Sequence, residues 1–137
     1  MHRKILIGGL LFSLLSVALG AFGAHALKAL VAADKLGVFE TGVRYQIIHS
    51  IALIVLSLYA SQNNTSIGTQ KGIGWAANFF IAGIICFSGS LYLLTLQNLF
   101  ALSWASFLGP ITPIGGLFFM LGWMSWLRVV FLHKVDK

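Results

Sequence analysis

Four long apolar runs limit what this chain can fold into more than any other feature of its sequence. A helix that crosses a bilayer needs about 20 predominantly apolar residues, and runs of this kind lie at residues 5–24, 42–60, 73–96 and 114–132. The sequence therefore predicts an all-α fold: an integral membrane bundle of four transmembrane helices that forms a single domain over residues 1–137.

The composition agrees with a membrane location. Charged residues make up 9% of the chain and hydrophobic residues 58%, whereas a soluble domain carries about 25% Asp, Glu, Lys and Arg. Water would disfavour a surface with so little charge, so the apolar excess is expected to face lipid. The lipid bilayer is thus the first partner that the sequence predicts.

The net charge of +6 does not indicate nucleic acid. The Lys and Arg residues are scattered at the ends of the apolar runs, which is typical of topology signals and headgroup contacts. A protein that binds nucleic acid would gather them in one patch. No nucleic-acid partner is therefore expected.

The first apolar run has features of a secretory signal peptide. Arg3 and Lys4 precede it, and Ala24-His25-Ala26 follows it like a cleavage site. Its apolar stretch of about 20 residues is longer than the usual signal-peptide core. We therefore expect an uncleaved first helix.

The segments between the spans also carry predictions. Residues 26–41 have a helix-forming composition with too many charges to cross, which predicts a short interfacial helix between spans one and two. The polar residues 61–71 predict a solvated loop. The uncharged residues 97–106 predict a linker in the membrane interface, with Trp104 at headgroup depth. Pro113 suits the first turn of the fourth helix, where its missing N–H is not needed.

The distribution of Lys and Arg predicts the orientation, because basic residues favour the cytoplasmic side of a membrane. If the N-terminus is inside, the basic residues on the cytoplasmic side are Arg3, Lys4, Lys71, Arg128, Lys134 and Lys137. Those on the opposite side are Lys28, Lys35 and Arg44. Both termini are therefore expected in the cytoplasm.

This orientation places most of the intramembrane polar side chains in the outer half of the bundle. They are His25, Tyr45, Gln46, His49, Ser88, Ser90, Tyr92 and Thr112. One interpretation is a hydrogen-bond network that fixes helix register. Another is a polar cavity around His49 that opens to the outer face and takes a small solute or protons. A third, a haem held between His25 and His49, needs both residues at one depth, and the sequence offsets them.

Small residues form a second set of candidates, because they allow helices to approach closely in membranes. The packing candidates are Gly20, Gly23, Ala24, Gly89, Gly115 and Gly116. Each of these contacts taken singly is expected inside one chain, and some of the set are expected to serve an interface between subunits.

The sequence contains no recognisable catalytic motif. Asp34, Glu40 and Asp136 all lie outside the predicted spans, which argues against a carboxylate-driven ion transporter. The sequence has no paired carboxylates, nucleophile elbow, CxxC or HExxH motif. Cys86 has no second cysteine to pair with. We therefore expect no catalytic residue, no resident metal and no cofactor.

Four ordered motifs carry a family resemblance. They are residues 20–27 (GAFGAHAL), 39–49 (FETGVRYQIIH), 87–92 (FSGSLY) and 109–116 (GPITPIGG). With them, nearly the whole chain resembles the YgdD/YwdK-like family of small membrane proteins, a domain of unknown function with relatives among small animal transmembrane proteins. The resemblance implies a four-span protein of the bacterial inner (plasma) membrane. It implies no activity, cofactor or substrate.

Three functions are compatible with these features. The first is an interaction or assembly protein that packs against a second copy of itself, as a homo-oligomer, or against another membrane protein. The second is a carrier or channel for a small solute or protons, with the cavity around His49. The third is a membrane enzyme or redox subunit. The sequence favours the first, because it offers packing faces and no legible chemistry.

Overall fold

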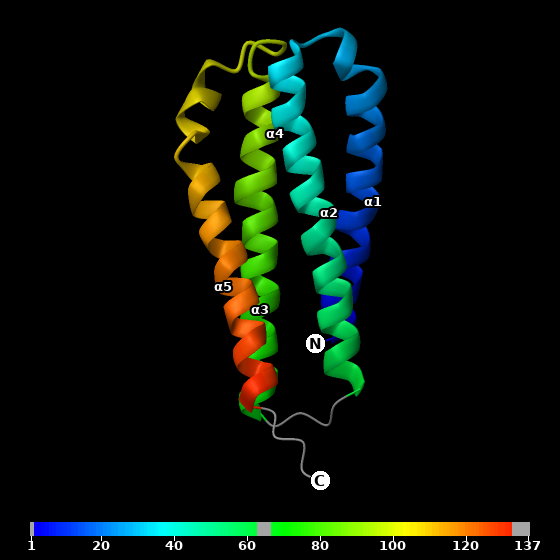
Figure 1. Ribbon diagram of the computed structural model, residues 1–137, viewed down its shortest axis with the longest axis vertical. Coiled ribbons are helices and arrows are strands. Elements are labelled where there is room, and N and C mark those ends of the chain that lie inside the picture. Colours follow the sequence, from blue (N-terminus) through cyan, green and yellow to red (C-terminus); the bar gives the residue numbers. More distant parts are fainter. Residues whose placement is uncertain (1, 63–66, 133–137) are drawn as a thin grey trace.

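The computed structural model describes residues 2–62 and 67–132, and all regular elements in these ranges are helical. The helices are α1 (His2–His25), α2 (Ala33–Gln62), α3 (Ile67–Gly83), α4 (Gly89–Leu96) and α5 (Ile111–Leu132). A π-helical segment, Ile84–Ser88, joins α3 to α4, and two short 3-10 segments, Leu27–Ala29 and Ser103–Leu108, lie at the end of the bundle away from the N-terminus (Figure 1).

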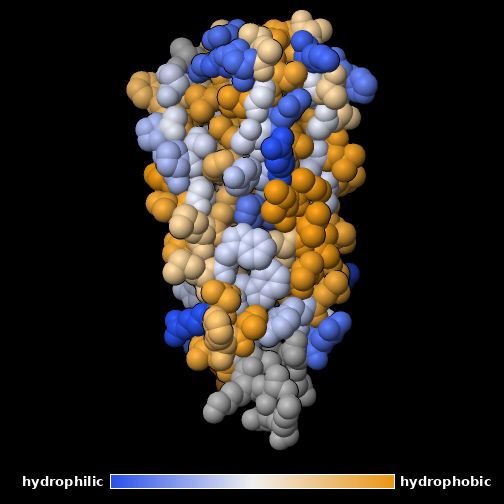
Figure 2. Space-filling view, viewed as in Figure 1, coloured by the Kyte–Doolittle hydropathy of each residue, from blue (hydrophilic) through white to orange (hydrophobic). Residues whose placement is uncertain are grey.

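The described residues contain four helical stretches that are long and apolar enough to cross a membrane. They are His2–Ala29, Ala33–Gln62, Ile67–Leu96 and Trp104–Leu132. The third stretch runs through α3, the π-helical segment and α4 without a break. Figure 2 shows hydrophilic residues at both ends of the long axis, apolar surface along the two flanks of this face, and a column of less apolar residues between the flanks. The prediction of an all-α membrane fold with four spans is confirmed.

The connection between the first two spans differs from the sequence prediction. Residues 26–41 do not form a separate helix, because α2 already begins at Ala33 and runs unbroken to Gln62. Phe39 anchors this early part of α2: its side chain is fully buried, and a Cβ on Gly23 of α1 would lie only 3.2 Å from the Phe39 ring. Only Leu27–Ala29 remains as a short turn between the two helices.

The other connections are also more helical than the sequence suggests. α2 continues to Gln62 and α3 starts at Ile67, so most of the loop predicted at residues 61–71 is helical, and residues 63–66 lie outside the described part. The linker after α4 contains the 3-10 segment Ser103–Leu108. Pro113 lies in the first turn of α5, as predicted.

The four spans form two pairs of antiparallel helices (Figure 1). α1 packs chiefly on α2, and α3 packs chiefly on α5. The pairs meet where α2 contacts α4 and the π-helical segment. The π-helical segment adds a residue to the helical turn and so rotates the contact face. The third span therefore presents its first half to α5 and its second half to α2.

Small residues at intervals of seven bring α1 onto α2. The buried face of α1 contains Gly9, Ser16 and Gly23, a spacing that keeps one face of a helix against its partner with a slight left-handed crossing. A Cβ on Gly9 would lie 3.0 Å from the Ser50 carbonyl oxygen on α2. The backbones of α1 and α2 therefore approach so closely at Gly9 that a larger residue would not fit. Such close contact gives membrane helices their van der Waals packing energy.

The α3–α5 pair uses glycines on both helices. Gly115 and Gly122 of α5 receive Phe87 and Phe80 from the third span. In return, Gly83 of α3 receives the Phe119 ring, and Gly72 of α3 receives Val129. Each large side chain thus fills the space that a glycine leaves on the opposite helix.

The apolar core lies in the half of the bundle nearer the N-terminus. Its most buried members are Leu53 and Leu56 of α2, with Ile73, Ala76 and Phe80 of α3, each 0% exposed. The buried hydrogen-bonding side chains lie mostly toward the other half. The two regions meet at His49, whose ring packs on Phe80 and Phe119 of the apolar core.

We expect Gly115→Ala to lower the free energy of unfolding in detergent micelles by about 1–3 kcal/mol, the usual cost of overpacking. The new Cβ would lie 2.7 Å from the Phe87 Cα, and backbone cannot rotate away as a side chain can. Gly116→Ala is the matched control, since its Cβ would only touch the Phe87 ring at 3.9 Å and the gain in helix propensity is the same. Equal unfolding midpoints for the two variants would contradict close packing at Gly115.

Candidate functional site

The predicted polar residues form three separate hydrogen-bonded groups rather than one cluster. Gln46 and Tyr92 belong to the first group, Tyr45 and His49 to the second, and Ser90 with Thr112 to the third. Each group joins side chains or carbonyls from different turns or helices. Together they bridge all four spans in the described part of the chain.

Gln46 holds three helices together. Its Nε2 donates to the Phe12 carbonyl of α1 at 3.0 Å, and its Oε1 accepts a hydrogen bond from the Tyr92 hydroxyl of α4 at 2.9 Å. The residue is 2% exposed. An amide buried in a membrane finds no water, so its partners must come from protein. Gln46 therefore supplies both the link between the helix pairs and a fixed depth for α1 beside α2.

His49 uses both ring nitrogens inside the protein. Its Nδ1 lies 2.8 Å from the Tyr45 carbonyl oxygen, which can only accept, so Nδ1 carries the hydrogen. Its Nε2 then accepts a hydrogen bond from the Trp123 indole Nε1 of α5 at 3.2 Å. These partners assign a neutral imidazole with one tautomer. No lone pair on the ring is left over for a metal or a haem iron while Trp123 stays in place.

Aromatic rings enclose the imidazole. The His49 ring stacks on Phe119 with centroids 3.5 Å apart and planes within 8°. Phe80 and Trp123 lie against the other sides, at 5.6 and 6.1 Å. His49 is consequently 4% exposed.

Beside His49 lies a groove of about 560 Å³ between α2 and α5. Its walls include Ile48, Leu117, Met120 and Trp123, each more than 40% exposed. These side chains belong to the apolar flank of the bundle. The groove therefore opens sideways toward lipid, whereas the cavity predicted around His49 was expected to open to the outer face.

The third group joins the ends of α4 and α5. The Ser90 and Thr112 hydroxyl oxygens are 2.7 Å apart, and Ser90 Oγ also donates to the Phe87 carbonyl at 2.9 Å. Ser88, one turn before Tyr92, is fully buried. Of these residues, Ser90 and Thr112 connect two helices.

His25 stands apart from all three groups. It is exposed at the last residue of α1, where neighbouring Gly23 packs beside Phe39. Gln46, about one turn before His49 on α2, bonds to the Phe12 carbonyl of α1. Phe12 is 13 positions before His25, or about 20 Å lower at the usual helical rise. The structure therefore contradicts a haem held between His25 and His49. In the described ranges, no three His, Cys, Asp or Glu side chains come together as a metal site.

The small-residue candidates divide into packed and open positions. Gly23 and Gly115 pack tightly against neighbouring helices, while a Cβ on Gly20 would make an ordinary contact, 3.6 Å from Val43. Gly116 is near Phe87 only at 3.9 Å, and Ala24 is exposed. A Cβ on Gly89 would meet nothing within 4 Å.

Sequence reasoning missed Trp123, Phe119 and the Phe12 carbonyl. Trp123 lies one turn after Phe119 on α5 and supplies the hydrogen bond that fixes the His49 tautomer. The available signal was that an indole N–H inside a membrane helix needs an acceptor. The sequence did not show which of the distant acceptors it would meet.

Four apolar helices joined by buried side-chain hydrogen bonds define a four-span integral membrane protein. Residues 19–116 match the family described as "Protein of unknown function (DUF423)". The chain belongs to this family, and the resemblance drawn from its motifs is confirmed.

Named relatives cover most of the chain. UPF0382 membrane protein SAB0533 of Staphylococcus aureus is 38% identical, over 94% of this chain and 96% of its own length. UPF0382 membrane protein YwdK of Bacillus subtilis is 40% identical, over 89% and 91%. UPF0382 inner membrane protein YgdD of Escherichia coli is 39% identical, over 88% and 84%. No solved structure matches the chain.

We expect Gln46→Leu and Tyr92→Phe to be coupled in a double-mutant cycle. Each variant removes the hydrogen bond between these two side chains, so the double variant should be more stable than the sum of the single losses predicts, by about 0.6 kcal/mol. The measurement is equilibrium unfolding in detergent micelles. Ser90→Ala is the matched control partner for Gln46→Leu, because its hydroxyl bonds to Thr112 and Phe87 instead. A coupling energy of zero for the first pair would contradict the bridge.

Proposed function

We propose that this protein is an interaction or assembly protein of the bacterial inner membrane, whose partner is a second copy of itself or another membrane protein. The relatives are named membrane or inner membrane proteins, and the chain's own geometry supplies the rest of the argument. The observation that carries the proposal is the position of α1.

α1 is attached along one face and open elsewhere. In the first span, 17% of the most apolar 18-residue stretch is buried inside the protein. In the second span, which contains α2, the corresponding share is 44%. The exposed side chains include Leu10, Leu11, Leu14 and Val17, all more than half exposed. A span held by a single neighbour gains little packing energy of its own. A partner helix against its open side would supply the missing contacts.

Two open glycines support the same proposal. A Cβ on Gly8 of α1 or on Gly89 of α4 would meet nothing within 4 Å. Inside the chain, therefore, neither glycine is needed for close packing. Glycine in a membrane span commonly allows a second helix to approach its backbone, and these two positions leave that approach available to another chain.

The geometry gives less support to a carrier or channel. A transport pathway needs polar groups that can exchange their partners with a solute. Here Gln46 and His49 are bonded within the bundle, and aromatic rings surround His49. The arrangement is that of a fixed structural network.

We expect Gly89→Leu and Gly8→Leu to weaken a native oligomer or complex while leaving the fold intact. The new side chain has open space in its own chain and would collide only with an approaching partner. The measurement is the native mass of the complex after gentle extraction from membranes. Gly37→Leu is the control, because it also points into open space but lies among the charged residues at the start of α2. An unchanged native mass for all three variants would overturn the proposal.

We also propose that both termini are cytoplasmic. Arg3, Lys4, Lys71 and Arg128 lie at the end of the bundle that holds the N-terminus (Figure 1), and Lys28, Lys35 and Arg44 lie toward the other end with Asp34 and Glu40. This excess of positive charge supports the orientation. Lys134 and Lys137, which add to the count, lie outside the described residues.

Cysteine labelling tests the orientation. In a Cys86→Ser background, we expect a membrane-impermeant maleimide to label Asn98→Cys in intact spheroplasts. Gln62→Cys, exposed at the opposite end of the bundle, should react only after the membrane is permeabilised. The reverse pattern would place both termini outside.

A further inference from the structure

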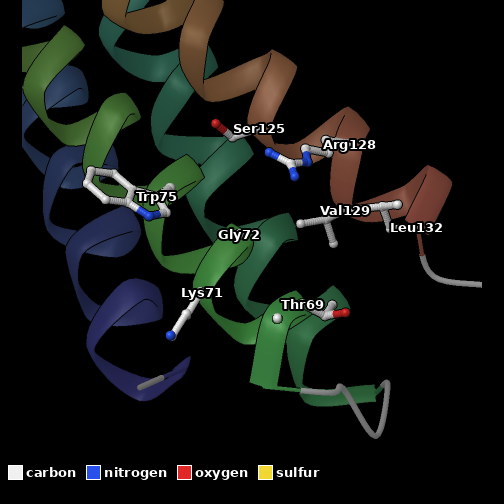
Figure 3. A pocket seen from close by; sticks show the side chains of 9 residues that line it. Thr69, Lys71, Gly72, Trp75, Ser125, Arg128, Val129 and Leu132 are labelled. Carbon is white, nitrogen blue, oxygen red and sulfur yellow. The ribbon is translucent and has the colours of Figure 1, made fainter.

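A second cavity lies at the end of the bundle that holds the N-terminus. It is a cleft of about 420 Å³ between the start of α3 and the end of α5. Figure 3 shows Lys71 and Trp75 on the α3 side, and Ser125, Arg128 and Val129 on the α5 side. None of these residues takes part in the polar groups around Gln46 and His49.

The helical repeat explains why these side chains meet. Lys71 and Trp75 are four positions apart on α3, and Ser125 and Arg128 are three apart on α5, so each pair shares a face of its helix. Gly72 forms the floor, because Val129 packs directly on it. Because Gly72 has no side chain, α3 and α5 are in contact at this position. The larger side chains on either side of the contact line the cleft.

The cleft is positively charged. Lys71 and Arg128 are exposed and line it together, and no acidic residue is among its lining residues in the described part of the chain. The described acids, Asp34 and Glu40, lie in the early turns of α2 at the opposite end of the bundle. The guanidinium of Arg128 reaches from α5 toward α3 (Figure 3). Such a planar group can offer two parallel N–H donors to a phosphate.

The depth of the cleft matches the phosphate layer of a bilayer. Lys71 is the fifth residue of α3, just before the apolar part of that helix begins. Arg128 is the fifth residue from the end of α5, and one more apolar turn follows it. Both cations therefore lie close to the helix ends at this end of the bundle. Trp75, one turn deeper, is 60% exposed, as is typical of tryptophan at the membrane interface. Val129 continues the apolar wall beside the cations.

We propose that this cleft binds the phosphate of an anionic phospholipid, with Lys71 and Arg128 supplying the charge and the Ser125 hydroxyl a further donor. Trp75 contacts the lipid below its phosphate. Basic pockets between membrane helices commonly hold such headgroups. The apolar side of the cleft, where Trp75 is 60% exposed, favours a lipid over a small soluble phosphate as the source.

Native mass spectrometry tests the proposal on the full chain, titrated in micelles with phosphatidylglycerol. We expect one tightly retained lipid. Lys71→Gln with Arg128→Gln should weaken its binding by about 30-fold, or about fivefold for each cation removed. The matched control is Lys28→Gln with Arg44→Gln, which removes the same two charge types from the opposite end and should keep the lipid. Equal retention in the two double variants would overturn the site.

Two further arms test the chemistry. The double variant Lys71→Arg with Arg128→Lys keeps both positive charges, so we expect it to retain the lipid. This result would show that the loss of charge is what weakens lipid binding in Lys71→Gln with Arg128→Gln. Phosphatidylcholine retained as tightly as phosphatidylglycerol would overturn selection for an anionic lipid. Glycerol phosphate that displaces the lipid at equal concentration would overturn the lipid as the source of the phosphate.

Discussion

Lipid offers a membrane helix neither hydrogen-bond partners nor a hydrophobic drive toward other helices, and this constraint shapes the whole molecule. Helices must then associate through close packing, which requires small residues at the contacts. The chain meets the requirement on two faces: Gly9, Ser16 and Gly23 bring α1 to α2, and glycines on both α3 and α5 receive large side chains from the opposite helix. Most of the fold follows from these two contacts.

The same constraint explains the polar layer. Gln46 finds an acceptor and a donor on two other helices, and His49 finds a carbonyl in its own helix and an indole in α5. These bonds are directional, so they select one depth and one rotation for each helix, which packing of small residues alone does not. The residues that resemble a transport site in the sequence make these hydrogen bonds within the bundle.

The number of spans could be predicted from the sequence, because the length of an apolar run decides whether a helix can cross the membrane. Of the residues that the sequence proposed for the polar cluster, Gln46, His49, Ser88 and Ser90 are buried. It missed Ser50, Ser57 and Thr95, which are buried as well. The sequence could not show which of these residues bond to each other: Trp123 and His49 are 74 positions apart, and nothing in a single sequence joins them.

The early start of α2 was missed because the charged residues at its beginning suggested a break, whereas burial of Phe39 against α1 extends the helix. Gly89 and Gly115 looked alike in sequence, and only geometry separates an open glycine from a packed one.

The division into two helix pairs has a consequence for biosynthesis. Each pair consists of consecutive spans, so its contacts are short in sequence and can form as soon as its second helix leaves the translocon. The bonds between the pairs, from Gln46 to Tyr92 and from His49 to Trp123, can close only after the later spans have inserted. They therefore distinguish a completed molecule from two adjacent hairpins, and a membrane protease that surveys new proteins would find its substrates among chains in which these bonds have not closed.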